Sequence, residues 1–147
     1  MTSHSSLLPA VAESMSLWHD MIAKRDLSAL PTIVASDATF RSPAFYKPYH
    51  SAAAVCLILN TVMTVFKEFE YHRTFASESG LDVTLEFSAI VGDKHLKGVD
   101  IIRFNEQGQI VEFEVMVRPL NALQQLATEM GEKLSAYLPK YKDMPSK

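Results

Sequence analysis

Residues 98–119 read GVDIIRFNEQGQIVEFEVMVRP, a pattern that predicts two strands joined by a tight turn at residues 105–108. Side chains alternate between the two faces of a strand, so Asp100 shares a face with Ile102 and Phe104. A carboxyl on an apolar face must be hydrogen-bonded, paired, protonated or functional. We therefore interpret Asp100 as the polar group of a cavity that the rest of the chain encloses.

The same alternation of apolar and polar residues predicts the neighbouring strands. They are expected at residues 69–77, 83–91 and 110–117, with a shorter strand at residues 38–42. In the last of the long strands, Val111 is expected on the same face as Phe113 and Val115.

Apolar residues at three- and four-residue spacing predict amphipathic helices at both ends of the chain and before the strands. The first stripe consists of Leu8, Val11, Met15, Trp18 and Ile22. The last stripe, after Pro119, consists of Leu123, Leu126, Met130, Leu134 and Tyr137. A third helix is expected at residues 51–66 and a short one at residues 27–34.

This order predicts a single α+β domain over residues 1–147. We expect a cone-shaped, curved antiparallel sheet, wrapped by N-terminal helices around a pocket, with an additional C-terminal helix. A sheet with one apolar face leaves a cavity where the helices do not fill the space above it.

Composition excludes several classes of function. The 147 residues carry a net charge of -3 with acids and bases interspersed, so nothing suggests binding to nucleic acid or to a membrane surface. No apolar run approaches the roughly 20 residues of a membrane span, and no secretory signal is apparent. We expect a cytoplasmic protein. The five histidines and the single Cys56 lack the spacing of metal ligands, so we predict no metal site and no cofactor.

Two segments carry a resemblance to a known family. Residues 26–40 look like the helix–turn–strand entry of the nuclear transport factor 2-like superfamily, and residues 98–110 are similar to a hairpin of its ketosteroid isomerases. The chain as a whole resembles the SnoaL-like branch of this superfamily. The resemblance implies a cone-shaped domain, but not one activity, because the scaffold supports divergent chemistry.

The resemblance also implies roles for three positions. Asp100 falls where ketosteroid isomerases keep a protonated aspartate that stabilises an oxyanion. Trp18 lies where those enzymes have their oxyanion tyrosine, and Ser42 where they have the general-base aspartate. An indole N–H can donate a hydrogen bond, but a serine cannot remove a carbon-bound proton unaided. The usual ketosteroid isomerase mechanism is therefore not expected.

The predicted site has Asp100 as the catalytic candidate and His72 as a second acid or base, as in dehydratase relatives. The predicted ligand-binding residues are Trp18, Phe40, Ser42, Phe45, Tyr46, Leu85, Phe87, Ile102, Phe113 and Val115. Simpler interpretations stay open. Trp18 is compatible with an ordinary core position, Ser42 with a turn residue and His72 with a surface position.

Two functions from different classes follow. In the first, the cavity binds a small, apolar, cyclic molecule. Whether a reaction follows is left open by the sequence; if it does, Asp100 takes part in an isomerase- or lyase-type proton transfer. In the second, the domain is non-catalytic, with a vestigial pocket, and serves dimerisation or protein interaction. In either case we expect a homodimer through the outer sheet face, where Val99, Ile101 and Met116 would otherwise be exposed.

Overall fold

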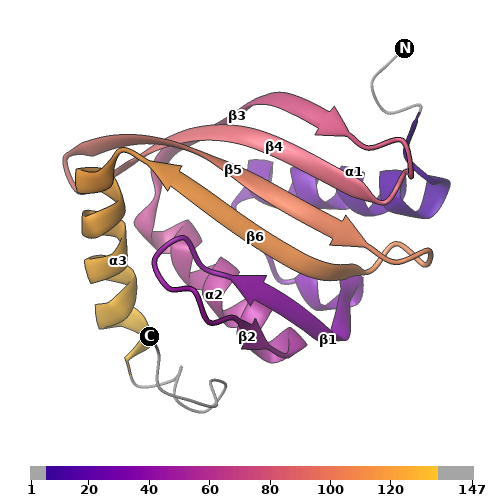
Figure 1. Cartoon of the computed structure of the whole chain (residues 1–147), viewed down its shortest axis with the longest axis horizontal. Coiled ribbons are helices and arrows are strands. Elements are labelled where there is room, and N and C mark those ends of the chain that lie inside the picture. Colours follow the sequence, from indigo (N-terminus) through magenta and orange to yellow (C-terminus); the bar gives the residue numbers. More distant parts are fainter. Residues whose placement is uncertain (1–5, 136–147) are drawn as a thin grey trace.

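A computed structural model of the chain describes residues 6–135. Three α-helices lie on one side of a six-stranded sheet (Figure 1). The helices are α1 (Pro9–Lys24), α2 (Ala52–Val65) and α3 (Leu120–Leu134), with a short 3-10 helix, η2 (Leu30–Ile33), after α1. The strands are β1 (Val34–Arg41), β2 (Tyr49–His50), β3 (Lys67–Ala76), β4 (Asp82–Val91), β5 (Lys94–Phe104) and β6 (Ile110–Arg118).

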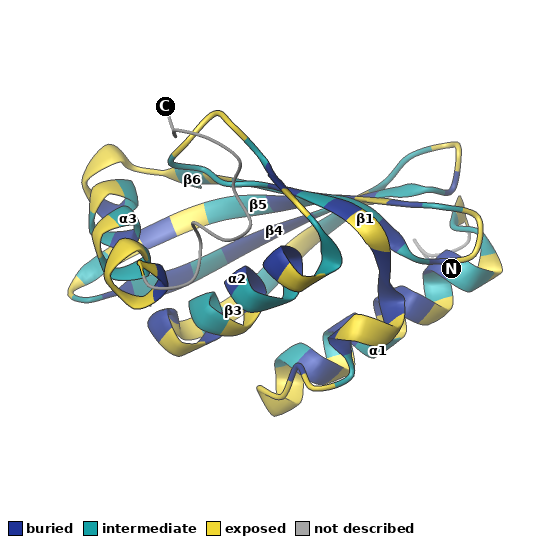
Figure 2. Cartoon of the chain, turned by 90° about the horizontal axis from the view of Figure 1, so that it is seen from below, coloured by how far each residue is buried: buried dark blue, intermediate teal, exposed yellow. Residues whose placement is uncertain are grey.

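The predicted α+β class and the curved sheet are confirmed, and the helices cover the concave face of that sheet (Figure 2). Strands β3 to β6 form an antiparallel meander, as expected. The sheet is nevertheless mixed, because β1 pairs parallel to β6 in the order β2-β1-β6-β5-β4-β3. Strands β1 and β6 are far apart in sequence, and local alternation carries no information on the direction of such a pairing.

The turn between β5 and β6 matches its prediction. The Oδ1 atom of Asn105 accepts hydrogen bonds from the backbone N–H groups of Gln107 and Gln109, and Gly108 adopts a φ of 80°. The pairing register shifts just before the turn, so that Phe104 pairs with Ile110. Ile110, and not Val111 as predicted, is therefore buried beside Phe104. A bulge of this kind inverts the strand faces on one side of it.

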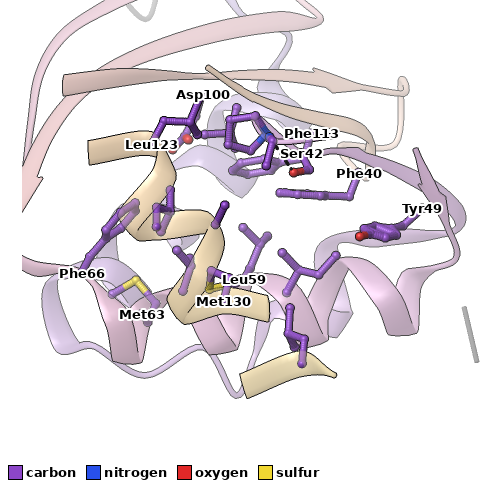
Figure 3. A pocket seen from close by; sticks show the side chains of 18 of the residues that line it. Phe40, Ser42, Tyr49, Leu59, Met63, Phe66, Asp100, Phe113, Leu123 and Met130 are labelled. Carbon is purple, nitrogen blue, oxygen red and sulfur yellow. Dashed lines mark hydrogen bonds between the residues drawn. The ribbon is translucent and has the colours of Figure 1, made fainter. Parts of the chain in front are cut away.

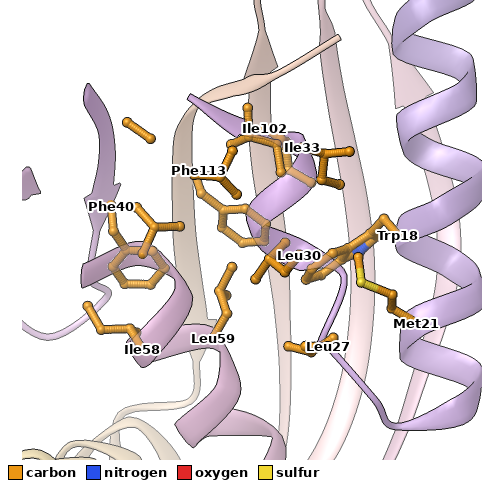
Figure 4. Close-up of a cluster of buried hydrophobic side chains, with 14 of the residues drawn as sticks. Trp18, Met21, Leu27, Leu30, Ile33, Phe40, Ile58, Leu59, Ile102 and Phe113 are labelled. Carbon is orange, nitrogen blue, oxygen red and sulfur yellow. The ribbon is translucent and has the colours of Figure 1, made fainter. Parts of the chain in front are cut away.

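The apolar side chains form two clusters. In the larger one, α1, η2 and α2 pack against the sheet, including β1. It contains Trp18, Leu30 and Phe113 (Figure 4). The smaller one joins α3 to β4 and β5 around Phe87 and Leu126. The predicted stripe of α1 contributes to the larger cluster, and the predicted stripe of α3 contributes to both clusters. Tyr137, which was assigned to the α3 stripe, lies outside the described residues.

Glycine at position 98 is required by the packing of this sheet. A Cβ atom there would lie 2.5 Å from the carbonyl oxygen of Met116 and 2.6 Å from the ring of Phe87. We predict that Gly98→Ala lowers the free energy of unfolding by about 1–3 kcal/mol, because the ring must shift to make room. Gly131→Ala in α3 is the matched control, since nothing lies within 4 Å of its added Cβ.

Gly131→Ala should leave the free energy of unfolding unchanged or raise it by up to about 1 kcal/mol, because alanine is a better helix former than glycine. Urea denaturation of the two variants measures both effects. Equal stability of Gly98→Ala and the unmodified chain would show that the sheet relaxes around the added methyl group.

Candidate functional site

A cavity of about 110 Å³ lies between the concave face of the sheet and the helices (Figure 3). The cavity lies where the two apolar clusters meet. Three residues of its wall contact both clusters, namely Tyr71, Val115 and Met130. Its wall is almost wholly apolar. The titratable side chains in that wall are Asp100, Tyr71 and Tyr49.

Asp100 extends from the middle of β5 toward the cavity, and only 6% of its surface is exposed. Its strand neighbours are Leu85 on β4 and Val115 on β6, so no charged side chain flanks it in the sheet. The Tyr71 hydroxyl of β3 donates a hydrogen bond of 2.6 Å to the Oδ2 atom of Asp100. Among the described residues, the other carboxyl oxygen, Oδ1, has no hydrogen-bond partner and is not fully buried, which leaves it facing the cavity.

Tyr71 is in turn held by Trp18. The indole Nε1–H group of α1 donates to the Tyr71 hydroxyl oxygen at 3.0 Å. Three elements that are distant in sequence, α1, β3 and β5, thus contribute to one hydrogen-bonded chain from Trp18 through Tyr71 to Asp100. Each polar atom of this chain would be costly to bury alone.

Burial dominates the electrostatics of the site. It raises the pKa of Asp100 from 3.8 to about 7, and the hydrogen bond from Tyr71 opposes this rise only in part. Burial, the charge of Asp100 and its hydrogen bond together raise the pKa of Tyr71 well above its ordinary value, so the phenol stays neutral. Near neutral pH, Asp100 therefore exchanges between a protonated and an ionised form, as a general acid or base requires.

Comparison with known proteins places this site in a family. The SnoaL-like domain model matches residues 16–113. The chain belongs to the SnoaL-like family. The superfamily suggested by the sequence is thereby confirmed.

Several solved structures resemble this SnoaL-like chain. A steroid delta-isomerase from Pseudomonas aeruginosa has 55% sequence identity and a TM-score of 0.87, over 90% of this chain and 96% of that chain. An uncharacterised protein with a cystatin-like fold from Silicibacter pomeroyi has 34% identity and a TM-score of 0.80, over 87% of this chain and 91% of that chain. SalBIII, an epoxide hydrolase/cyclase-like enzyme of salinomycin pyran ring formation, shares the fold at 18% identity, with a TM-score of 0.61 over 75% of this chain and 91% of that chain. A search of curated proteins found no match.

The structure brings most of the predicted ligand-binding residues of the SnoaL-like chain to one cavity. Its wall includes Trp18, Phe40, Ser42, Phe45, Phe113 and Val115 together with Asp100. Leu85, Phe87 and Ile102 also point to the concave side, but they are fully buried in the core and do not line the cavity. Tyr46 is 92% exposed and lies outside the cavity wall. Strand parity thus gives the face of a residue but not the side chains that cover it.

The remaining polar candidates are engaged elsewhere. His72 lies on the outer face of the sheet, where its Nε2 atom is 2.8 Å from the Ser88 hydroxyl. The Ser42 hydroxyl lines the cavity but accepts a hydrogen bond from the backbone N–H of Ala44 at 3.0 Å, which stabilises the turn after β1. Neither residue lies in hydrogen-bonding contact with Asp100.

Sequence reasoning missed Tyr71. The residue lies in the strand that was predicted at residues 69–77, and its hydroxyl gave no pattern of its own. One signal was present, since Tyr71 is the only tyrosine in the four strands β3 to β6. The contribution of α3 to the cavity wall, through Leu123 and Met130, was also not anticipated.

Within residues 6–135, no group of three or more His, Cys, Asp or Glu side chains is arranged to hold a metal ion. In the same part of the chain, no helix is both long and apolar enough to cross a membrane.

The pKa of Asp100 predicts how stability depends on pH. The folded chain keeps this proton up to about pH 7, whereas the unfolded chain releases it near pH 3.8, so stability falls as pH rises between these values. The full effect is roughly 4 kcal/mol. Asp100→Asn should abolish this dependence and be more stable than the unmodified chain at pH 8.

Urea denaturation at several pH values measures this effect. Glu86 does not interfere above pH 5, because hydrogen bonds from Arg73 and Lys97 lower its pKa to about 2. Its contribution is present above its ordinary pKa of 4.5 and is lost only in more acidic solution. Parallel stability curves for the two proteins between pH 5 and pH 8 would contradict a raised pKa for Asp100.

Proposed function

We propose that this SnoaL-like protein binds a small, apolar, cyclic ligand in its cavity and that Asp100 catalyses an isomerase-type proton transfer on it. The observation that carries the proposal is the buried carboxyl of Asp100 in an almost wholly apolar cavity wall. Burial there raises its pKa to about 7. The Pseudomonas aeruginosa steroid delta-isomerase, at 55% identity, adds support for an isomerase.

The cavity wall favours a ligand with one polar group. Transfer of a hydrocarbon ring from water into the cavity is favourable, whereas a second polar group would lose its hydration without gaining an equivalent hydrogen bond. Size favours a small ring, because an apolar cavity of about 150 Å³ holds benzene. The present cavity of about 110 Å³ is of that order, so a one-ring compound is the first ligand to test.

In the proposed isomerisation, Asp100 is the one proton-transfer group. In its ionised form, Oδ1 of Asp100 takes a proton from a carbon between a carbonyl group and a double bond. The C–H bond electrons form an enolate, and the neutral acid then returns the proton to the far carbon of the former double bond. The double bond moves into conjugation with no net oxidation. This route does not use His72, which lies outside the cavity wall.

The first functional test uses 3-cyclohexenone, whose conversion to the conjugated 2-cyclohexenone is followed by ultraviolet absorbance. Turnover should rise with pH to a plateau above about pH 7, because the ionised form of Asp100 starts the reaction. Asp100→Asn should lower kcat by about 100-fold or more, because the amide cannot accept the proton.

The same variant should retain binding. Since Tyr71 donates to Oδ2, the asparagine amide should turn its oxygen toward Tyr71 and its NH₂ group toward the cavity, where it can donate to a carbonyl. Asp82→Asn is the matched control, because Asp82 pairs with Arg103 away from the cavity. Full activity in Asp100→Asn, or none in the unmodified protein with cyclic β,γ-enones of one to four rings, would overturn the proposed activity.

A second candidate is a non-catalytic module that joins two copies of this chain through the outer sheet face. The observation that favours it is an exposed apolar area, in which Met116 is 50% exposed beside the partly exposed Val99 and Ile101. Arg73, Glu86 and Lys97 form ion pairs on the same face and would give the interface a polar part.

We predict that Met116→Glu converts a dimer into a monomer, because it places a charge in the centre of the apolar area. Sedimentation of both proteins at micromolar concentration measures the change in mass. Glu106→Gln, in the exposed turn between β5 and β6, is the control and should sediment as the unmodified protein does. An unmodified protein that sediments as a monomer would exclude this interface.

A further inference from the structure

The donors and acceptors between Trp18 and Asp100 can be assigned from chemistry alone. An indole N–H can only donate, so the Tyr71 oxygen must accept the hydrogen bond from Trp18. The hydroxyl hydrogen of Tyr71 is then free to point the other way, and Oδ2 of Asp100 lies 2.6 Å from the hydroxyl oxygen. This oxygen of the carboxyl is therefore an acceptor.

The assignment decides where a protonated Asp100 carries its hydrogen. A carboxylic acid has one O–H group, and a hydrogen on Oδ2 that pointed at Tyr71 would collide with the hydroxyl hydrogen already there. The carbonyl oxygen of a protonated carboxyl is a stronger acceptor than its hydroxyl oxygen. Since Oδ2 accepts from Tyr71, Oδ2 is assigned as the carbonyl oxygen and Oδ1 carries the hydrogen. This is the oxygen that has no partner among the described residues and that faces the cavity.

We propose that Trp18 and Tyr71 are positioning residues that keep Oδ2 of Asp100 as a fixed acceptor and Oδ1 as the atom that exchanges a proton with the ligand. The inference deepens the proposed function and rests on it for its role in catalysis. The hydrogen-bonded arrangement itself can be measured without any ligand.

Trp18 has a role distinct from that of Tyr71. Without the indole donor, the Tyr71 oxygen could accept a hydrogen bond from Oδ2–H, and the direction of the bond between Tyr71 and Asp100 would reverse. The proton of Asp100 would then point away from the ligand. Trp18 disfavours this reversed arrangement, because the Tyr71 oxygen already accepts from the indole and its own hydrogen then has Oδ2 as its acceptor.

Few other titratable groups lie near the hydrogen bonds that join Trp18, Tyr71 and Asp100. The ring of His19 on α1 meets the ring of Tyr71 edge-on, with 5.6 Å between the centroids. Tyr49 of β2 lines the same cavity, while the side chains that α2 and α3 contribute to the wall are apolar. No lysine, arginine or glutamate belongs to the described cavity wall. Tyr71 is thus the direct polar partner of Asp100, and its removal should dominate any change at the carboxyl.

The test compares Tyr71→Phe and Trp18→Phe with the unmodified full-length protein. Carboxyl-carbon NMR, assigned with Asp100→Asn, gives the pKa of Asp100 in each. Tyr71→Phe should raise this pKa by about one pH unit, because the ionised form loses its donor. Trp18→Phe should raise it by less, because Tyr71 becomes a weaker donor. Phe75→Leu, which changes an exposed ring of β3 outside the cavity wall, should leave it unchanged.

Infrared spectroscopy gives an independent readout. Below pH 6, the C=O stretch of protonated Asp100 should move to higher wavenumber in Tyr71→Phe, because the carbonyl oxygen, Oδ2, loses its hydrogen bond. Replacing Tyr71 by 3-fluorotyrosine preserves the shape of the residue and makes it a stronger donor, so the pKa of Asp100 should fall. This substitution decides the question if Tyr71→Phe does not fold.

Two outcomes separate this inference from the proposed function. If the pKa of Asp100 responds as expected but no cyclic enone is bound or converted, the arrangement holds and the proposed activity is wrong. If 3-cyclohexenone is converted but neither Tyr71 substitution moves the pKa or the pH profile of kcat, the positioning role is wrong. A lowered melting temperature with an unchanged pKa would show that Tyr71 and Trp18 only stabilise the fold.

Discussion

The hydrogen bond from Tyr71 to Asp100 is the contact on which the cavity depends. A carboxyl moved from water into an apolar wall loses hydration that is worth several kcal/mol if it is charged. One donor offsets part of this loss, and the remainder appears as a pKa of about 7. An added cation would have held Asp100 ionised, and a fully apolar surrounding would have kept it protonated. The single neutral donor leaves both forms accessible.

The cavity itself follows from the division of the apolar core. Helix α1 packs with β1 and α2, whereas α3 packs against β4 and β5, and the two clusters touch through only a few shared residues. Tyr71 is one of them, so the residue that satisfies Asp100 also joins the clusters. A substitution of Tyr71 is therefore expected to change both the packing between the two clusters and the hydrogen bond to Asp100.

The sequence was sufficient to predict the sheet face on which Asp100 lies, but not to predict its hydrogen-bond partner. Period-two alternation fixes which side chains of one strand share a side, and it placed Asp100 with Ile102 and Phe104 correctly. The partner comes from β3, whose register against β4 shifts between Tyr71 and Thr74. Such bulges, like the one that buries Ile110 in place of Val111, depend on contacts between strands and leave no periodic trace in the sequence. Trp18 illustrates a further limit, because a helical stripe indicates burial but not that the indole N–H finds an acceptor.

Glu86 shows that the partner, and not the sheet, determines what an acid does here. It lies on β4 and Asp100 on the adjacent β5, and both are largely buried in opposite faces of one sheet. Two cations, Arg73 and Lys97, lower the pKa of Glu86 to about 2, so it remains charged at any physiological pH and serves as an ion-pair partner. Within residues 6–135, no cation pairs with Asp100, and its proton equilibrium lies near neutrality instead. A SnoaL-like sheet can thus carry a structural acid and a proton-exchanging acid on neighbouring strands. The two acids differ in how strongly burial acts on the carboxyl and in the charge of the groups that donate to it.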